Sequence, residues 1–279
     1  MTAAGGPETP FAAVTGWPAA HSLSPVMMTH WLEAAGLEGR YGVLELPPER
    51  FAAGVRAAAT LGMAGLNVTL PHKTAALRLA DETGAAAHAI GAANLLTFAA
   101  DGRIRADNTD IAGIAAALEA DDGRGPAVLI GAGGAARAAL FHLSGQEREI
   151  RIVNRTHDTA ERLIAEFGVR AQVFKDASAG ALRGAALVIN ATSLGMTGMP
   201  ALAPDFSVCT DGALAFDMVY TPLLTPFLIS AREHGLKTAD GLTMLIGQAR
   251  PSFAAFFGAP APACDGVRAV LERKLGTRP

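Results

Sequence analysis

The stretch Gly131-Ala132-Gly133-Gly134-Ala135 has the composition of a turn that binds phosphate groups. It follows the apolar run 128–130 and opens an alanine-rich segment with apolar residues at helical spacing, which predicts a strand, a tight turn and a helix. Glycine has no Cβ and lets the backbone approach a pyrophosphate, and the helix that follows offers unpaired N–H groups to the anion. Because the spacing differs from the common Gly-x-Gly-x-x-Gly, a glycine-rich turn without a ligand remains the alternative.

The residues after the next expected strand favour NADP as the ligand. Residues 149–153 predict a strand that ends at Asn154-Arg155-Thr156. In dinucleotide-binding folds this position meets the adenosine ribose, where a carboxylate favours NAD and a cation favours the 2′-phosphate of NADP. The chain has an arginine and no carboxylate there. A plain turn in which Thr156 caps the next helix would explain Thr156 but would leave Arg155 without a role.

Ser22 and Ser24 form a second polar group near the N-terminus. Ser24 precedes Pro25, which is typical of a helix start, and Gly36 is suited to end that helix. Capping explains Ser24, and a turn explains Ser22. Two hydroxyls at a helix N-terminus would equally bind a carboxylate, because hydroxyl donors and the helix dipole both favour an anion. These residues alone do not decide between the two interpretations.

Asn67, Thr69 and Lys73 form a third group at the end of an expected strand, 65–69. Lys73 falls in the first turn of the next expected helix, where the helix dipole disfavours a cation. Functional positions often break a local rule in this way, and open α/β sheets bind ligands at the carboxyl ends of their strands. A solvated lysine on a helix surface is the alternative.

Asp110 ends the polar segment 107–110, just before the expected apolar helix 111–118. An aspartate there is an ordinary N-cap. The segment lacks the glycine and the terminal glutamate of an EF-hand loop, so we expect no metal ion.

The composition fits an α/β enzyme of one large or two modest domains. The 279 residues are 50% hydrophobic and 18% charged, and the net charge of −3 argues against a nucleic-acid binder. The two cysteines provide no disulfide or metal framework, which favours a reducing compartment. We see neither a signal peptide nor a membrane span in the sequence, and we expect a cytoplasmic protein without membrane contact.

Alternating strand and helix patterns predict the architecture. Strands are expected at 11–16, 41–46, 65–69 and 95–98, with a hairpin at Asp101-Gly102, and further strands at 171–174, 186–190 and 214–218. A long apolar helix is expected over 242–257. We predict a two-domain α/β protein: an N-terminal α/β substrate-binding domain (1–111 with 240–279) and a Rossmann-like, doubly wound parallel-sheet domain that binds NADP (112–239).

From about Phe11 to Gly258 the order of these stretches resembles the shikimate dehydrogenase family. The resemblance rests on eight stretches: His21-Ser22-Leu23-Ser24-Pro25, Asn67-Val68-Thr69-Leu70-Pro71-His72-Lys73, Asp107-Asn108-Thr109-Asp110, Gly131-Ala132-Gly133-Gly134-Ala135, Asn154-Arg155-Thr156, Asn190-Ala191-Thr192-Ser193-Leu194-Gly195-Met196, Asp217-Met218-Val219-Tyr220 and Gly241-Leu242-Thr243-Met244-Leu245-Ile246-Gly247-Gln248-Ala249.

The resemblance implies reversible reduction of 3-dehydroshikimate to shikimate by NADPH, in aromatic amino-acid biosynthesis. It implies Lys73 as the catalytic acid/base, paired with Asp110. Substrate-binding residues would be Ser22, Ser24 and Tyr220 at the carboxylate, and Thr69, Lys73, Asn94, Asp110 and Gln248 around the ring hydroxyls. Cofactor-binding residues would be Gly131, Ala132, Gly133, Gly134 and Ala135 at the pyrophosphate, Asn154, Arg155 and Thr156 at the 2′-phosphate, and Met218 and Gly241 at the nicotinamide. The expected partner is a small-molecule substrate, and the chain would be a monomer or a homodimer.

Three positions depart from the family pattern. Leu95 follows Asn94 where threonine is common, Met28 replaces a frequent histidine, and Thr159 stands where NADP-specific members usually carry a second basic residue. NADP preference could therefore be softer, although no carboxylate replaces the missing cation. The alternatives are a quinate/shikimate dehydrogenase that uses NAD, and a non-catalytic ligand-sensing relative, which would require the loss of an acid/base residue.

Overall fold

The computed structural model describes residues 9–276. The chain divides into two compact units, one with the residues up to Thr109 and Ala249–Leu271, the other with Asp110–Gln248 and the residues from Glu272 onward. Each unit contains a six-stranded sheet, and the α/β, two-domain fold class is confirmed. The expected domain boundaries, 1–111 with 240–279 and 112–239, stay a prediction.

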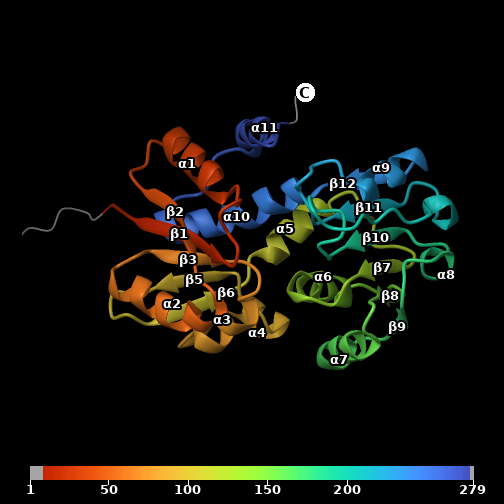
Figure 1. Cartoon of the computed structure of the whole chain (residues 1–279), viewed down its shortest axis with the longest axis horizontal. Coiled ribbons are helices and arrows are strands. Elements are labelled where there is room, and N and C mark those ends of the chain that lie inside the picture. The colour runs from red at the N-terminus through yellow and green to blue at the C-terminus, as the bar shows by residue number, and fades with distance from the viewer. Residues whose placement is uncertain (1–8, 277–279) are drawn as a thin grey trace, which may run out of the picture. The chain divides into compact units, whose positions relative to one another are not determined.

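The first unit is built on a mixed sheet with the strand order β2-β1-β3-β5-β6-β4. β1 runs parallel to β2 and β3, whereas β5 is antiparallel to both of its neighbours. In Figure 1, α1 lies on one side of this sheet and α2, α3 and α4 lie on the other. The elements are β1 (Phe11–Gly16), α1 (Ser24–Ala35), β2 (Arg40–Glu45), the 3-10 helix η1 (Pro48–Arg50), α2 (Phe51–Thr60), β3 (Gly65–Val68), α3 (Lys73–Leu79), β4 (Glu82–Thr83), α4 (Ala85–Ile90), β5 (Leu95–Phe98) and β6 (Ile104–Asp107).

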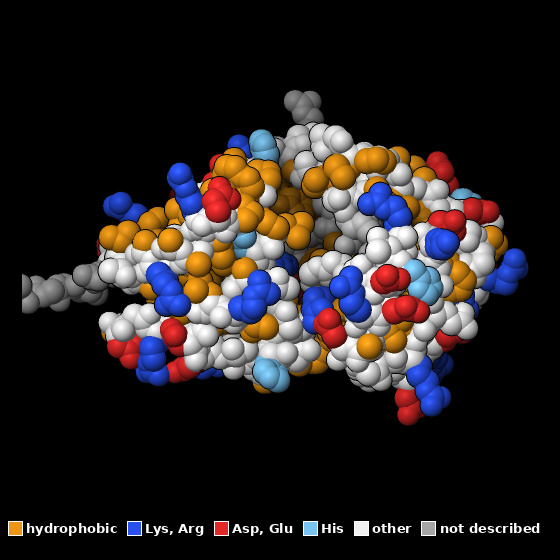
Figure 2. All heavy atoms as spheres, turned by 60° about the horizontal axis from the view of Figure 1, so that its bottom comes forward, with side chains coloured by type: hydrophobic (Ala, Val, Ile, Leu, Met, Phe, Trp, Pro, Cys, Tyr) orange, Lys and Arg blue, Asp and Glu red, His pale blue; other side chains and the backbone are white. Residues whose placement is uncertain are grey.

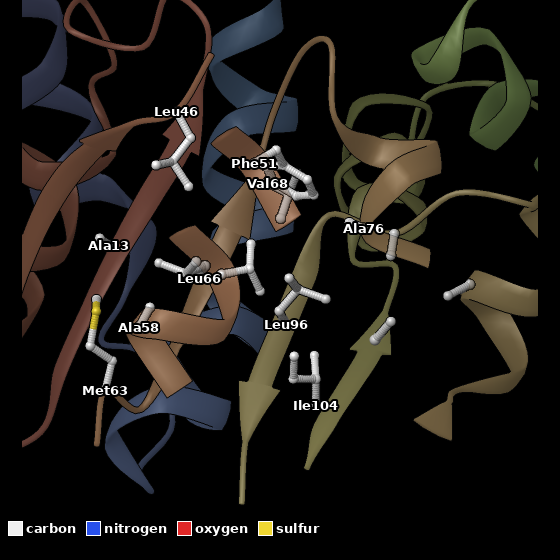
Figure 3. Packing of buried hydrophobic residues seen from close by; sticks show 14 residues of the cluster. Ala13, Leu46, Phe51, Ala58, Met63, Leu66, Val68, Ala76, Leu96 and Ile104 are labelled. Carbon is white, nitrogen blue, oxygen red and sulfur yellow. The ribbon is translucent and has the colours of Figure 1, made fainter. Parts of the chain in front are cut away.

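The core of the first unit decides which way the polar residues of β3 point. Leu66 and Val68 pack against Phe51 and Ala58 of α2 in one apolar cluster (Figure 3). Successive side chains of a strand point to opposite faces of the sheet. Asn67, between these two apolar residues, therefore faces away from this cluster, towards the other side of the sheet.

The second unit is built on a parallel sheet with the order β12-β11-β10-β7-β8-β9. β7 lies beside β10, so the order reverses between these strands, and doubly wound sheets bind ligands at such a point. In Figure 1, α6 and α7 lie on one side of the sheet and α9 lies on the other. The elements are α5 (Asp110–Ala117), β7 (Ala127–Ile130), α6 (Gly134–Ser144), β8 (Ile150–Val153), α7 (His157–Phe167), β9 (Ala171–Phe174), α8 (Ala179–Leu182), β10 (Leu187–Asn190), the 3-10 helix η2 (Phe206–Val208), β11 (Leu214–Asp217), α9 (Pro226–Glu233) and β12 (Lys237–Ala239).

Two helices have residues in both units. α10 spans Gly241–Phe257 and α11 spans Cys264–Lys274.

On the face in Figure 2, Lys and Arg side chains lie interspersed with Asp and Glu side chains. Among residues 9–276, no helix is long and apolar enough to span a membrane.

Most expected elements are confirmed, and the strand bounds agree to within one residue. The Asp101-Gly102 hairpin joins β5 and β6 as expected. The short elements β4, α4, α8 and β12 were not predicted, because two to six residues carry too little periodicity. Capping by Ser24 is wrong: Leu23 occupies the N-cap of α1, and no side chain caps that helix.

Candidate active site

In the first unit, several chain segments meet at one edge of the sheet. The Thr69 N–H donates to the Thr15 carbonyl oxygen (2.8 Å), which joins the ends of β1 and β3. The Ala93 N–H donates to the carbonyl of Lys73, the first residue of α3 (2.9 Å). The Asn94 N–H donates to the Asp107 carbonyl (3.1 Å). These bonds anchor the backbones of Thr69, Lys73 and Asn94 to neighbouring segments of the first unit, and the clustering of their side chains around a substrate stays a prediction.

A buried network of side chains lies behind this edge. The Tyr41 hydroxyl donates to Asn67 Oδ1 (2.8 Å), and Asn67 Nδ2 donates to Ser252 Oγ (2.8 Å). Asn94 Oδ1 accepts from the Thr109 N–H (2.7 Å), and Thr109 Oγ1 lies 3.4 Å from Ser252 Oγ. The network thus links β2, β3, the segment before β5 and the second half of α10.

Ser24 extends the network towards Ser22. Its side chain forms a hydrogen bond with Tyr41, and the Ser24 N–H donates to Ser22 Oγ (3.2 Å). Burial raises the pKa of Tyr41 far above its ordinary value, and the hydrogen bond with Ser24 partly opposes this shift. Tyr41 is therefore a neutral donor at physiological pH. The carboxylate-binding role of the two serines stays a prediction.

The two residues expected to transfer the proton each begin a helix. Lys73 is half-buried at the start of α3, and Asp110 is only 2% exposed at the start of α5. Asp110 directly follows Thr109, which the network holds through Asn94. The hydrogen bond between the Thr109 N–H and Asn94 therefore anchors the backbone directly before Asp110.

In the second unit, the glycine turn combines one glycine with a positive φ and one with open space around it. Gly131 has φ +111°, and a Cβ there would lie 2.9 Å from Thr192 Cγ2. Gly133 is extended at the N-cap of α6, and a Cβ there would meet no atom within 4 Å. No side chain caps α6. The first N–H groups of the helix therefore donate to no side-chain cap, and such groups favour an anion.

The end of β8 lies beside the glycine turn, since Ile130 and Val153 are paired in the parallel sheet. Asn154 Nδ2 donates to the Thr156 carbonyl (2.7 Å), which closes the turn into α7. Thr156 occupies the N-cap of α7, but its side chain makes no capping hydrogen bond, so the capping alternative is wrong. Arg155 is exposed and forms no ion pair within residues 9–276.

The segment after β11 is fixed by the fully buried carboxylate of Asp217. Oδ1 accepts from Asn190 Nδ2 (2.9 Å) and the Val219 N–H (3.0 Å), and Oδ2 accepts from the Thr225 hydroxyl (2.6 Å). Burial raises the pKa of Asp217, and these three donors oppose the shift. The carboxylate thereby ties β10 and the start of α9 to the residue before Met218.

Met218 and Gly241 lie against each other, because a Cβ on Gly241 would collide with the Met218 carbonyl oxygen. Close approach explains why this position is a glycine. Tyr220 is half-buried two residues further along, and burial raises the pKa of its hydroxyl. Gln248 is half-buried in α10.

Two protein-family models match the chain in succession. The shikimate dehydrogenase substrate binding domain matches residues 14–96, and shikimate / quinate 5-dehydrogenase matches residues 118–196. The chain belongs to the shikimate dehydrogenase family.

Shikimate dehydrogenases from other organisms are similar to this chain over nearly its whole length. The shikimate dehydrogenase (NADP(+)) of Maricaulis maris is 47% identical over 272 residues, which cover 96% of this chain and 97% of that protein. Shikimate 5-dehydrogenase from Thermus thermophilus, crystallised with NADP(H) and shikimate, has a TM-score of 0.83 at 36% identity and covers 95% and 99%. Shikimate 5-dehydrogenase from Listeria monocytogenes, in complex with shikimate and NAD, has a TM-score of 0.83 at 26% identity and covers 97% and 99%.

The structure also adds residues that sequence reasoning missed in this member of the shikimate dehydrogenase family. Tyr41 and Ser252 bind the polar side chains of the predicted substrate site, but neither stands in a polar cluster of the sequence. Of the departures from the family pattern, Met28 is fully buried and Leu95 is 6% exposed, so both are packing positions.

Proposed function

We propose that the chain catalyses the reversible NADPH-dependent reduction of 3-dehydroshikimate to shikimate. The observation that carries this proposal is the buried network of Tyr41, Asn67 and Ser252, with Asn94 and Ser24 attached to it. A rigid set of hydroxyl and amide groups suits a polyhydroxylated ring acid, because each substrate hydroxyl needs a partner of fixed orientation. Family membership supports the same activity.

For the substrate, we propose the following contacts. Ser22, Ser24 and Tyr220 bind the carboxylate through their hydroxyl groups. Thr69, Asn94 and Gln248 bind the ring hydroxyls, together with Lys73 and Asp110. Burial raises the pKa of Tyr220, so this phenol stays protonated at neutral pH. A protonated phenol can donate a hydrogen bond to the carboxylate, which supports the proposed contact.

Lys73 is the proposed acid/base and Asp110 its partner. NADPH, when bound, supplies the hydride. Negative charge develops on the ketone oxygen during reduction, so the Lys73 ammonium stabilises that oxygen and gives it a proton; in the reverse direction its amine accepts the proton.

NADP is supported as the cofactor by the residues of the second unit. The uncapped start of α6, with the open backbone at Gly133, suits the pyrophosphate. Asn154, Arg155 and Thr156 are proposed at the 2′-phosphate, and Met218 and Gly241 at the nicotinamide. A quinate/shikimate dehydrogenase that uses NAD is the second candidate, because one matching family model covers both acids; the unpaired Arg155 favours NADP.

We also propose a cytoplasmic location and a monomer or homodimer as the assembly. The two cysteines, Cys209 and Cys264, are both free thiols, which is typical of a reducing compartment. The proposed partners are the small-molecule substrate and the cofactor, without nucleic acid or membrane.

The test measures absorbance at the reduced-nicotinamide band with shikimate and NADP, beside quinate and NAD. Lys73→Ala should lower turnover by at least about a hundredfold, the lower end of general acid–base contributions, while NADPH affinity stays nearly unchanged. Lys237→Ala, which removes an exposed lysine of β12, is the matched control. Near-normal turnover of Lys73→Ala would remove this residue from its role. Quinate oxidation with NAD that outpaces shikimate oxidation with NADP would replace the proposed activity.

A further inference from the structure

Two arginines stand at the start of α7. Arg155 directly precedes the N-cap Thr156, and Arg162 lies in the second turn of the helix. Arg162 Nε donates to the Asp158 carbonyl (3.2 Å), and Nη2 donates to Thr159 Oγ1 (3.4 Å). The Arg162 side chain therefore runs back towards the N-terminus of the helix, and its guanidinium lies beside Thr159.

Neither guanidinium is neutralised by a carboxylate. Among residues 9–276, Arg155 and Arg162 take part in no ion pair, although both are exposed. Other arginines of this unit do pair: Arg137 lies 2.6 Å from Glu166 and Arg148 lies 2.7 Å from Asp121. A guanidinium without a carboxylate partner can still bind a phosphate, and Arg162 uses only Nε and Nη2 for its bonds to Asp158 and Thr159.

The other ionisable residues on α7 are a histidine and three carboxylates, of which Glu166 pairs with Arg137. His157, Asp158 and Glu161 are all exposed. A ring nitrogen of the histidine and one oxygen of each carboxylate lie within 4.8 Å of one another. His157 Nδ1 is 3.4 Å from Glu161 Oε1. Glu161 is thus turned towards His157, and neither it nor Asp158 makes an ion pair with Arg162.

The start of α7 is also placed for the adenosine end of a dinucleotide. The Gly131 N–H donates to the Val153 carbonyl (2.8 Å), so the glycine turn directly adjoins the end of β8. A dinucleotide with its pyrophosphate at that turn presents its adenosine ribose to the end of the second strand. The Thr156 side chain does not cap α7, so the helix N-terminus adds its own preference for an anion.

We propose that Arg162, together with the Thr159 hydroxyl and Arg155, binds the 2′-phosphate of NADP. Position 159, where a second basic residue would stand, lies one helical turn before Arg162. The Arg162 guanidinium beside Thr159 therefore takes the place of that residue. Arg162 is thus a specificity-determining residue that keeps the preference for NADP over NAD. The inference rests on the proposed use of NADP.

The test measures binding of 2′,5′-ADP and 5′-AMP by titration calorimetry, which needs no turnover. Because Arg162 is exposed, the loss of its charge-assisted hydrogen bond by Arg162→Ala should weaken 2′,5′-ADP binding about tenfold, which corresponds to about 1.4 kcal/mol. Binding of 5′-AMP, which lacks the 2′-phosphate, should stay unchanged. Arg170→Ala removes an exposed arginine beyond the other end of α7 and should change neither affinity.

A second variant tests the exchange between the two positions. Thr159→Arg in the Arg162→Ala background should restore 2′,5′-ADP binding, because it returns a cation to the same region. Equal weakening of both ligands by Arg162→Ala, or no weakening of either, would overturn the inference, and so would a wild-type protein that binds the two ligands equally. Failure of shikimate oxidation with intact 2′,5′-ADP selectivity would instead overturn the proposed function and leave the role of Arg162 standing.

Discussion

Replacing Tyr41 by phenylalanine removes one hydroxyl from the middle of the buried network. Tyr41 is 9% exposed and Asn67 is 8% exposed, so water does not readily replace the lost group. Asn67 Oδ1 loses its donor, and Ser24 loses its partner on β2. The ring itself stays, including its contact with Phe256 at 6.3 Å between centroids.

The expected loss follows from these contacts. A buried acceptor left without a donor costs about 1–3 kcal/mol, so the free energy of unfolding should fall by about 2 kcal/mol. Asn67 and Ser24 would also sample more orientations. If about 1 kcal/mol of this ordering is lost from substrate binding, the KM for shikimate rises about fivefold, since 1.4 kcal/mol corresponds to a factor of ten.

The pH dependence of stability gives an independent sign. Burial raises the pKa of Tyr41 above the unfolded value of about 10, so the folded state keeps its proton where the unfolded chain loses it. The stability that this hydroxyl contributes is complete below about pH 10 and declines as the pH rises further. The difference in stability between the wild type and Tyr41→Phe should therefore shrink above that pH.

The assays are urea denaturation between pH 7 and about 11, and steady-state kinetics with each substrate varied. Ser230→Ala is the matched control, because it removes one hydroxyl that donates to the Pro204 carbonyl (2.8 Å) in the second unit. It should lower stability without raising the KM for shikimate. A Tyr41→Phe variant that raises the KM for NADP as much as the KM for shikimate would refute the positioning role, as would unchanged stability and KM.

Two further changes test the second unit. Gly131→Ala places a Cβ 2.9 Å from Thr192 Cγ2 at φ +111°, so it should lower both the melting temperature and the affinity for NADP. Gly133→Ala places a Cβ in open space, so it should keep the melting temperature and weaken NADP binding. Calorimetry of both variants checks this, and normal NADP affinity of Gly133→Ala would contradict it. Burial raises the pKa of Asp217 in the folded state, so its contribution to the free energy of unfolding declines as the pH rises above about 4. In urea denaturation, the stability of the wild type relative to Asp217→Asn should therefore fall from about pH 4 to about pH 7. A rise over this range would contradict the direction of the pKa shift.

The sheets could be predicted because each strand is a short apolar run bounded by turn residues. Val128 to Ile130 runs into the glycine cluster, and Leu187 to Asn190 ends at a polar segment. Because strand ends gather at one edge of a parallel sheet, their order also predicts which polar groups come together. The proximity of the glycine turn to the end of β8 follows from this reasoning and is confirmed.

The hydrogen-bond network could not be predicted, because its partners are distant in the sequence. Asn67 is 26 residues from Tyr41 and 185 residues from Ser252. Tyr41 stands in a strand and Ser252 inside an apolar helix, where a tyrosine or a serine carries no signal of its partner. Periodicity indicates which face of an element is buried, but not which buried polar group meets which.

The two threonines at N-cap positions show where a local rule stops. Thr225 accepts a hydrogen bond from the Leu228 N–H (3.3 Å) and donates to Asp217, so it caps α9 and is fully buried. Thr156 occupies the same position of α7 but is exposed and caps nothing. The start of α7 could be predicted from Thr156, because threonine favours the extended backbone of an N-cap.

What the hydroxyl does depends on its surroundings. A capping side chain accepts from N–H groups that would otherwise donate to an anion. The uncapped start of α7, next to two arginines that form no ion pair among residues 9–276, therefore remains available for a phosphate. The absence of a Thr156 cap at α7 thus supports the proposed roles of Arg155 and Arg162.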